Sequence, residues 1–325
     1  MSMSRIPFEQ LPAEVRQAVA DKTGTVHQAM TAPGGMNSGI ASVLDTDSGP
    51  VFVKGIPADH PQVGAQRREA AVAAHLPSSC PRLYWHLELG GWSLLGYEVI
   101  DGRHADYTPG SPDLPLVEAA LAELQGITAP ADVDIKRAVD RWAEYAPPGT
   151  LQHFDGEALL HTDFAPDNVL IAEGRARLID WAWPTRGAAW IDPGALALRL
   201  VDAGHPVKSA IEYAGRFPSW RGAAPEALAA FGTATASLWR EINRTTPRVR
   251  GRWRSGRRRW HAPSARTRSR GRPRRKPGTG VGSIGIARRT AALRPRRASF
   301  PETQAPSLGY SCPRPPARTR AQDGR

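Results

Sequence analysis

The sequence contains little cysteine and has no long hydrophobic run. Two cysteines in 325 residues, Cys80 and Cys312, are too few for a disulfide framework or a cysteine-based zinc site. No segment approaches the ~18 consecutive apolar residues of a membrane-spanning helix. The N-terminal residues also lack the apolar core of a signal peptide. We therefore expect a soluble, cytoplasmic protein with no membrane partner.

Acidic residues are almost missing from the C-terminal quarter of the chain. Residues 244–325 contain 24 Lys and Arg but only 2 Asp and Glu, a net charge of +22, whereas residues 1–243 have 19 basic and 29 acidic side chains, a net charge of −10. So large an asymmetry within the overall charge of +12 indicates two segments of different character. The basic segment is rich in Arg, Pro, Gly and Ser and has no hydrophobic periodicity, so we expect it to be disordered.

The first hundred residues show the pattern of a small sheet with few helices. Alternating and β-branched residues bounded by turn signals predict five strands. A helix is predicted before the first strand and another after the third. The expected strands are 25–31, 40–45, 50–55, 83–87 and 92–100, and the expected helices are 8–23 and 65–75.

Helical periodicity dominates from residue 101 to residue 243. A connector rich in Gly and Pro, 101–112, is followed by expected helices at 116–125, around Ile135, Val139 and Trp142, and at 194–203, 207–216 and 225–243. One hairpin interrupts them, with strands at 169–172 and 175–179 joined across Glu173-Gly174. The pattern predicts an α+β fold with a sheet lobe followed by a helical lobe.

The strongest chemical signal is the run His161-Thr162-Asp163-Phe164-Ala165-Pro166-Asp167-Asn168, followed twelve residues later by Asp180. Phosphoryl transfer needs a metal ion held against the phosphates and a hydroxyl group aimed in line. The predicted hairpin after Asn168 would fold back and bring Asp180 beside it. Oxygen ligands of this kind suit Mg²⁺. Asp163 would orient and deprotonate the hydroxyl, while Asn168 and Asp180 would hold the metal.

The pattern His-x-Asp-x-x-x-x-Asn, then a hairpin, then Ile179-Asp180-Trp181, resembles the aminoglycoside phosphotransferase family over roughly residues 20–243. The resemblance implies a two-lobed protein-kinase-like fold, ATP and Mg²⁺ as cofactors, and a small-molecule hydroxyl as acceptor, with an aminoglycoside-like substrate favoured. It makes Asp163 the catalytic base, Asn168 and Asp180 the Mg²⁺ ligands, and His161 and Asp192 supports of the catalytic loop.

Kinase-type folds also need a strand lysine at the ATP phosphates and a helix glutamate that holds it. Lys54 lies in the predicted strand Val51-Phe52-Val53-Lys54, and Glu69 lies on the next predicted helix. In this order before the Asp163 motif, the two residues fit that pair. Taken alone, Lys54 is more typical of a solvated lysine at a strand end, and Glu69 of a surface acid on a helix.

Two further nucleotide contacts are expected from position in the chain. Ser38 and Gly39 close a glycine-rich turn whose backbone amides can approach phosphates, although it does not match Gly-x-Gly-x-x-Gly and also fits a simple hairpin turn. Glu98 and Ile100 sit where an adenine-binding hinge would contact the base through backbone groups. We therefore expect a nucleotide-binding lobe over 1–100, a catalytic helical lobe over 101–243 and a basic tail over 244–325.

Three alternatives stay open. Asp163, Asn168 and Asp180 are residue types that also cap turns, so the chain can be a non-catalytic kinase-like remnant that binds nucleotide at most. The tail can bind RNA, DNA or anionic surfaces by counterion release, with Trp253 and Trp260 stacking on bases. The tail is also typical of a shifted reading frame in GC-rich DNA, which we favour because the family continues with ordered helices.

Overall fold

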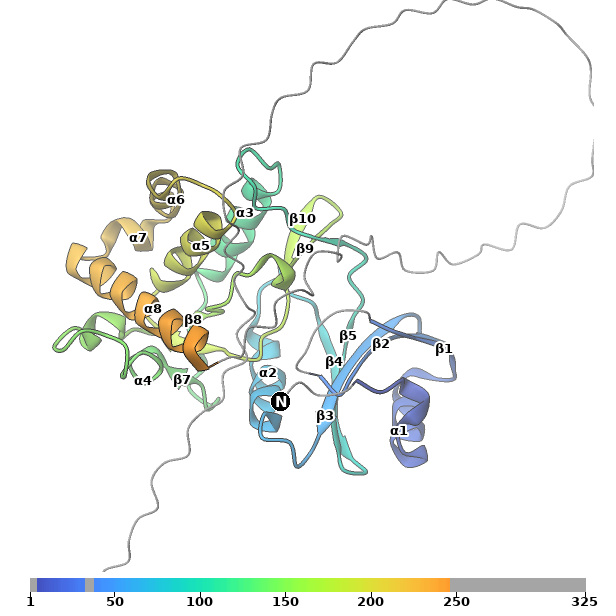
Figure 1. Ribbon diagram of the computed structural model, residues 1–325. Helices are drawn as coiled ribbons and strands as arrows, with labels where there is room; N and C mark the ends of the chain where they lie inside the picture. Colours follow the sequence, from blue (N-terminus) through green and yellow to red (C-terminus); the bar gives the residue numbers. More distant parts are fainter. Residues whose placement is uncertain (1–4, 33–37, 246–325) are drawn as a thin grey trace, which may run out of the picture.

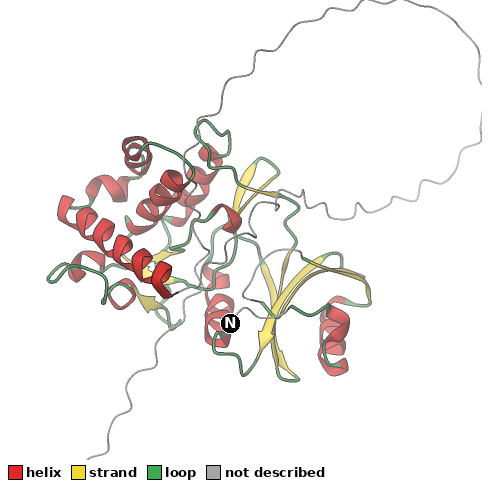
Figure 2. Ribbon diagram, in the orientation of Figure 1, coloured by secondary structure: helices red, strands yellow, loops and turns green. Residues whose placement is uncertain are grey.

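The computed structural model describes residues 5–32 and 38–245, which form two lobes (Figure 1). One lobe is built on a twisted antiparallel sheet and the other is mainly helical, as the colouring by secondary structure shows (Figure 2). The predicted disorder of the basic tail and most of the glycine-rich turn lie outside the described residues.

The sheet lobe contains five strands in the order β1-β2-β3-β5-β4. All neighbouring strands are antiparallel. The strands match the predicted ones to within about two residues at either end. Their bounds are β1 Val26–Thr31, β2 Ile40–Thr46, β3 Val51–Pro57, β4 Leu83–Leu89 and β5 Trp92–Glu98.

One face of this sheet packs against helix α1, Ala13–Thr23, in a core that includes Val51 and Val53. Successive side chains of a strand point to opposite faces. The alternate residues of β3, Phe52 and Lys54, therefore point to the other face, where helix α2, Val63–Val72, lies between the sheet and the helical lobe (Figure 1).

The helix predicted over residues 8–23 is interrupted. A 3₁₀ turn at Phe8–Gln10 precedes α1, and Leu11 between them has an extended ψ of 150°. The cause is Pro12, because a proline disfavours the helical conformation of the residue before it. The prediction of one continuous helix is therefore wrong at its N-terminal end.

The helical lobe contains α3 Leu114–Leu124, α4 Ala138–Arg141, α5 Ile191–Asp202, α6 Val207–Ala214, α7 Pro218–Gly222 and α8 Pro225–Thr245. Its two small sheets have the orders β10-β9-β6 and β7-β11-β8. Their strands are β6 Arg103–His104, β7 Lys136–Arg137, β8 Ala158–Leu160, β9 Val169–Ala172, β10 Arg175–Leu178 and β11 Thr185–Gly187. Short 3₁₀ turns lie at η2 Ala73–His75, η3 Leu151–Phe154 and η4 Pro166–Asn168.

The helix predicted around Ile135, Val139 and Trp142 is largely wrong. Residues Lys136–Arg137 form strand β7, which pairs in parallel with β11, and helix α4 is only four residues long. The pairing partner is some fifty residues away in the sequence, so local periodicity does not reveal it. Trp142 is nevertheless buried, with its ring 5.7 Å from that of Phe154.

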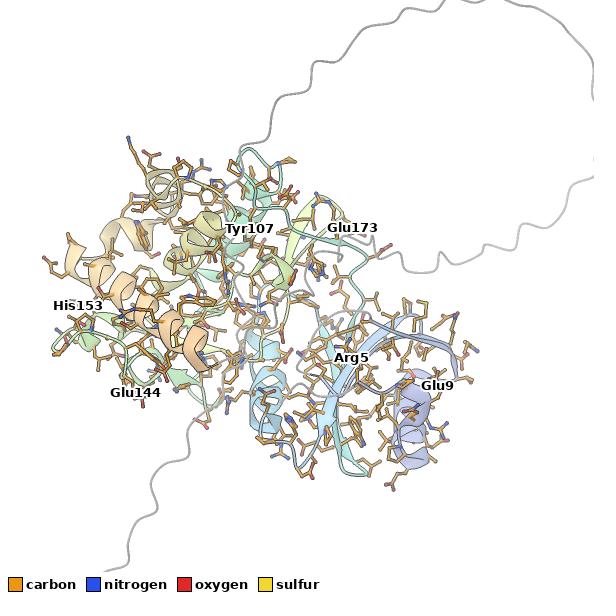
Figure 3. All side chains as sticks on the ribbon, viewed as in Figure 1. Arg5, Glu9, Tyr107, Glu144, His153 and Glu173 are labelled. Carbon is orange, nitrogen blue, oxygen red and sulfur yellow. The ribbon has the colours of Figure 1, made fainter. Side chains whose placement is uncertain are left out.

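Side chains fill the interior of both lobes (Figure 3). Tyr107, labelled in the helical lobe, belongs to its largest hydrophobic cluster, together with α3, α5 and the β9–β10 hairpin. This packing fixes the hairpin against the helices. Within residues 5–32 and 38–245, no helix is both long and apolar enough to cross a membrane.

Candidate active site

The Lys54 side chain joins three parts of the fold. Its Nζ atom lies 2.9 Å from Oδ1 of Asp180, which follows the β9–β10 hairpin 126 residues later. It also donates a hydrogen bond of 2.9 Å to Oε1 of Glu69 on α2 and makes an ionic contact of 2.8 Å with Oε2. The structure thus brings the predicted strand lysine, helix glutamate and second aspartate into one cluster.

Burial gives this cluster its electrostatic character. The side chains of Lys54 and Glu69 are 14% and 4% exposed, while that of Asp180 is 41% exposed. Burial alone would lower the pKa of Lys54, but the charges of Asp180 and Glu69 outweigh it and raise that pKa. The ammonium group in turn lowers the pKa of Asp180. Lys54 therefore remains positively charged, and its ammonium group lies next to the partly exposed carboxylate of Asp180.

Tyr97 on β5 completes the cluster, and the sequence patterns did not identify it. Its hydroxyl donates a hydrogen bond of 2.9 Å to Oε1 of Glu69, and both side chains are buried. The tyrosine therefore helps to hold Glu69 toward Lys54. No sequence motif marks this position, because a tyrosine on a strand is expected for packing alone.

The predicted catalytic loop, residues 161–168, is held by Asp192 at the start of α5. Its Oδ2 and Oδ1 atoms accept hydrogen bonds of 2.9 Å from the backbone amides of His161 and Thr162. Burial raises the pKa of Asp192 to about 6, against the opposing effect of those amides. Asp192 thus lies where the family resemblance expects a support of the loop.

His161 links the predicted catalytic loop to the strand that precedes Asp180. Its Nε2 atom lies 3.0 Å from the Ile179 carbonyl oxygen, which can only accept, so Nε2 carries the proton. Its Nδ1 atom accepts from the Asp163 amide at 3.3 Å. The ring also packs edge-on against Trp181, with 4.7 Å between centroids. These contacts connect the two ends of the predicted motif.

The β9–β10 hairpin returns Asp180 to the predicted catalytic loop, as the spacing predicts. Its turn residues Glu173 and Gly174 have φ values of 50° and 72°, as a type I′ turn requires. At the open end, the Ile179 amide donates a 2.9 Å hydrogen bond to the Asn168 carbonyl. Asn168 is therefore paired with Ile179, the residue that immediately precedes Asp180.

Backbone strain concentrates at the same place. Within the described part of the chain, three residues other than glycine have φ in the left-handed region: Glu173 in the hairpin turn, Thr162 at 66° and Asp180 at 63°. Such conformations cost on the order of 1–3 kcal/mol and persist where surrounding contacts enforce them. Thr162 immediately precedes Asp163, and Asp180 immediately follows Ile179, whose amide bonds to the Asn168 carbonyl, so the strain lies next to the predicted site residues.

The oxygen atoms needed for a magnesium ion are available. Asn168 donates through Nδ2 to the Asp163 carbonyl at 3.2 Å, which leaves its Oδ1 without a protein donor among the described residues. Oδ2 of Asp180 is likewise free of protein donors there. Residues 5–32 and 38–245 contain no cluster of three or more His, Cys, Asp or Glu suited to a metal. Two oxygen ligands fit Mg²⁺, which usually keeps waters and substrate phosphates as its other ligands.

Asp163 itself lies in the loop with one carboxylate oxygen engaged. Oδ1 accepts from Arg199 Nη2 at 2.8 Å and from the Ala165 amide at 3.3 Å. Sequence patterns missed Arg199, although an arginine in the apolar helix segment Ala195-Leu196-Ala197-Leu198-Arg199 signals a buried cation that needs a carboxylate.

The predicted hinge lies between the lobes. The carboxylate of Glu98 is 2.7 Å from Arg177 of β10 and accepts from the Arg82 amide at 3.1 Å. Neither the amide nor the carbonyl of Ile100 takes part in a backbone hydrogen bond with another described residue. A free backbone donor and acceptor at this position suit an adenine edge. Gly102 allows the connector to approach β9, since a Cβ there would lie 2.7 Å from the Ile171 oxygen.

The expected phosphate loop is only partly described. Ser38 and Gly39 immediately precede β2, and the Gly39 carbonyl accepts from the Ile6 amide at 2.8 Å. Residues 33–37, which include the other glycines of the turn, lie outside the described residues. The role of Ser38 and Gly39 in phosphate binding stays a prediction.

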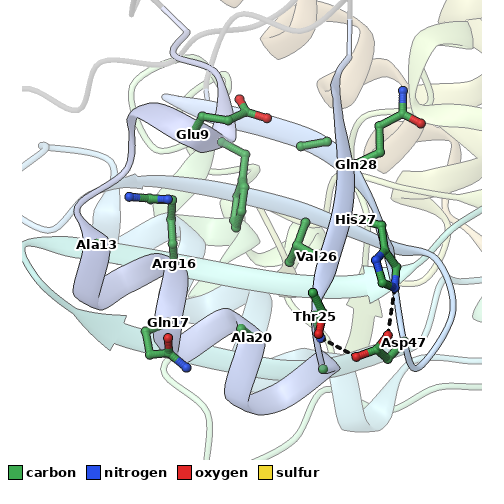
Figure 4. Close-up of a pocket in the computed structure, with 13 residues that line it drawn as sticks. Glu9, Ala13, Arg16, Gln17, Ala20, Thr25, Val26, His27, Gln28 and Asp47 are labelled. Carbon is green, nitrogen blue, oxygen red and sulfur yellow. Dashed lines mark hydrogen bonds and ion pairs between the residues drawn. The ribbon is translucent and has the colours of Figure 1, made fainter.

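A groove of about 790 Å³ lies elsewhere, between α1 and β1 (Figure 4). It is lined in part by Arg16, His27 and Asp47, and His27 Nε2 lies 2.8 Å from Asp47 Oδ1. Both side chains of that pair are more than half exposed, so water screens their interaction. None of the predicted site residues lines this groove.

Comparisons with known proteins find similarity in structure alone. No protein-family model and no curated protein sequence matches the chain. Choline kinase LicA from Streptococcus pneumoniae matches with a TM-score of 0.50 and 14% identity, over 72% of this chain and 92% of that one. A thermostable mutant of aminoglycoside phosphotransferase APH(4)-Ia, in complex with ADP and hygromycin B, gives a TM-score of 0.47 and 17% identity, over 70% of this chain and 90% of that one. An aminoglycoside-3'-phosphotransferase of type VIII gives a TM-score of 0.45 and 20% identity, over 68% of this chain and 97% of that one.

At these identities the likeness concerns the fold. The antiparallel sheet lobe, the helix α2 beside it and the helical lobe with its hairpin correspond to the two-lobed arrangement expected from the sequence. The chain therefore has the protein-kinase-like fold of choline kinase LicA, which confirms the predicted α+β fold class.

Proposed function

We propose that this chain is a phosphotransferase that moves the γ-phosphoryl group of ATP to a hydroxyl group of a small molecule. The observation that carries the proposal is the position of Lys54, which contacts Glu69 on α2 and Asp180 after the hairpin within 2.9 Å. A fold of kinase type with a cationic strand residue, a helix carboxylate and a second carboxylate in contact has the parts that phosphoryl transfer needs.

Each residue of the cluster has a definite task in this scheme. Lys54 binds phosphate oxygens, and Glu69 and Tyr97 keep its ammonium group in place. Backbone groups of the Glu98–Ile100 segment bind the adenine edge. Asn168 Oδ1 and Asp180 Oδ2 would hold Mg²⁺, which, when bound, neutralises charge on the phosphates. The strained backbone at Asp180 keeps its carboxylate directed toward Lys54 before nucleotide binds.

Asp163 acts on the acceptor. Its Oδ1 atom is engaged by protein donors, so Oδ2 is the oxygen that accepts a hydrogen bond from the acceptor hydroxyl and takes its proton as the new P–O bond forms. The phosphoryl group leaves ADP at the same time. Because this transition state is loose, the orientation of the hydroxyl contributes more than the strength of the base.

The acceptor class we favour is a cationic molecule that carries hydroxyl groups, an aminoglycoside first and a choline-like amino alcohol second. Two observations support this class. Residues 1–243 carry a net charge of −10, which attracts cations. The motif around Asp163 resembles that of aminoglycoside phosphotransferases, and LicA is a choline kinase.

Nucleotide binding is tested first, by thermal unfolding of the full chain with and without Mg²⁺ and ATP. A ligand at about 100 times its dissociation constant adds about 2.7 kcal/mol to stability. We expect a clear rise in the melting temperature of the wild type and a much smaller one in Asp180→Ala. No rise in the wild type would leave the chain without a working nucleotide site.

Transfer is tested by ADP release in the presence of hygromycin B, kanamycin or choline. Asp163→Asn should abolish acceptor-dependent release, because the amide cannot take the hydroxyl proton. Asp167→Asn is the matched control: it makes the same change in the same loop, at an exposed side chain that forms no hydrogen bond or ion pair with the described residues. Nucleotide binding without any acceptor-dependent release would favour a non-catalytic kinase-like protein instead.

A further inference from the structure

The carboxylate of Asp163 is held unevenly. Oδ1 receives both protein donors, Arg199 Nη2 at 2.8 Å and the Ala165 amide at 3.3 Å. Oδ2 receives no donor from the described part of the chain. The two side chains of the ion pair are largely buried, with Arg199 only 11% exposed. The contact therefore lies mostly out of water, where a charged hydrogen bond is strong and directional.

Arg199 is itself fixed from two further sides. Its Nη1 atom lies 3.8 Å from Oδ2 of Asp202, one helical turn later on α5. Its guanidinium carbon lies 5.4 Å from the centre of the Trp239 ring on α8, a cation–π distance. Helices α5 and α8 also contact each other in the helical lobe (Figure 1). The guanidinium group is thus a rigid donor whose position both helices determine.

A carboxylate on a short side chain turns easily about its terminal bond, since that torsion has a broad preference. Two donors on one oxygen remove this freedom and fix the plane of the group. From this geometry we infer that Arg199 is a positioning residue, which anchors the Asp163 carboxylate through Oδ1 and presents Oδ2 to the acceptor hydroxyl. The inference rests on the proposed function and adds a residue that the motif does not contain.

The position of Arg199 predicts which kinetic constant depends on it. It interacts with the acceptor-side carboxylate of Asp163, and its other partners are Asp202 and Trp239 rather than Lys54, Asn168 or Asp180. Loss of Arg199 should therefore lower kcat and leave the KM for ATP unchanged. A lysine keeps the charge but loses the planar fork, so it should restore part of the rate.

The experiment compares Arg199→Met, Arg199→Lys and Arg216→Met with the wild type, by ADP release with the acceptor that supports turnover. Arg216→Met is the control, because Arg216 makes an ion pair of 2.7 Å with Glu118 at the surface of the same lobe. We expect Arg199→Met to lose kcat on the order of 100-fold, the size of a misplaced reacting group. Arg199→Lys should recover part of the loss, and the control should match the wild type. An unchanged kcat, or a kcat that rises in Arg199→Met because Arg199 competes with the acceptor, would overturn the inference.

A second measurement needs no turnover. Urea unfolding of Asp163→Asn, Arg199→Met and the double variant forms a double-mutant cycle, and the contact predicts a loss in the double variant smaller than the sum of the single losses. Additive losses would show that the two side chains do not interact, and would overturn the positioning role directly. Coupled losses in a protein without turnover on any acceptor would refute the proposed function and reduce the ion pair to a structural contact.

Discussion

The Lys54–Glu69 pair allows a quantitative prediction about stability. Lys54→Met removes the ammonium group and leaves the Glu69 carboxylate, 4% exposed, with Tyr97 as its remaining side-chain donor. Breaking a buried ion pair by deleting one partner costs about 3–5 kcal/mol, because an uncompensated charge stays buried. Asp180 adds little to this cost, since its side chain is 41% exposed and water solvates it once Lys54 is gone.

The cost should depend on pH with a definite sign. Burial raises the pKa of Glu69, and the Lys54 charge opposes that effect. Without Lys54 the pKa in the folded protein rises further above its unfolded value, so the contribution of Glu69 to stability is lost as pH rises through that window. We therefore expect Lys54→Met to be less destabilising near pH 5, where Glu69 can take up a proton, than near pH 8.

A double variant separates charge from packing. Lys54→Met combined with Glu69→Met removes both charges and keeps apolar volume, a change that is often close to neutral for stability. We expect the double variant to recover most of the stability lost in Lys54→Met. It should still fail to respond to Mg²⁺ and ATP, because the phosphate ligand is missing.

The assay is urea unfolding of the full chain at both pH values, followed by tryptophan fluorescence. For a domain of this size the single change corresponds to a fall in melting temperature of roughly 6–20 °C. A double variant as unstable as Lys54→Met would refute the reasoning. So would an equal cost at the two pH values, because either result means that Glu69 is not buried as a charge.

Two further predictions concern the catalytic loop. Burial raises the pKa of Asp192 to about 6, above its unfolded value of 3.8, so its contribution to stability falls as pH rises between these values. Asp192→Asn does not titrate, so its stability deficit against the wild type, measured by urea unfolding, should shrink by roughly 3 kcal/mol from below pH 4 to above pH 6; a constant deficit would contradict this. Thr162 has φ of 66°, and Thr162→Gly relieves about 1–2 kcal/mol of strain against about 0.5–1 kcal/mol of glycine entropy. It should raise the urea midpoint or leave it unchanged, and a clear fall would show that the Thr162 side chain stabilises the loop.

The sequence predicted those features whose information is local. Strand alternation located the five strands of the sheet lobe, and the Glu173-Gly174 dipeptide located the hairpin turn. The helix predicted around Ile135 was wrong, because β7 is stabilised by pairing with β11, whose residues are distant in sequence. The prediction of one helix over residues 8–23 was wrong at Leu11 for a different reason. Pro12 signals a helix break, but the helical spacing of the apolar residues was given more weight in the prediction.

For the candidate site, the order and spacing of Lys54, Glu69, Asp163, Asn168 and Asp180 were evident from the sequence, because each belongs to a short motif with its own chemistry. Only the tertiary structure decided that Lys54 contacts Glu69 and Asp180 together, and that Asp163 is anchored through one oxygen. These contacts join elements up to 126 residues apart, and no local pattern encodes them.

By itself, then, the sequence determined a kinase-like order of elements and a set of polar residues suited to nucleotide and metal. The structure decided which of their atoms are engaged and which are free. It also placed Tyr97 behind Glu69 and Arg199 behind Asp163. The physical reason is that hydrogen-bonding groups occur throughout a sequence, whereas their burial and mutual distance arise only when the sheet lobe and helical lobe pack together.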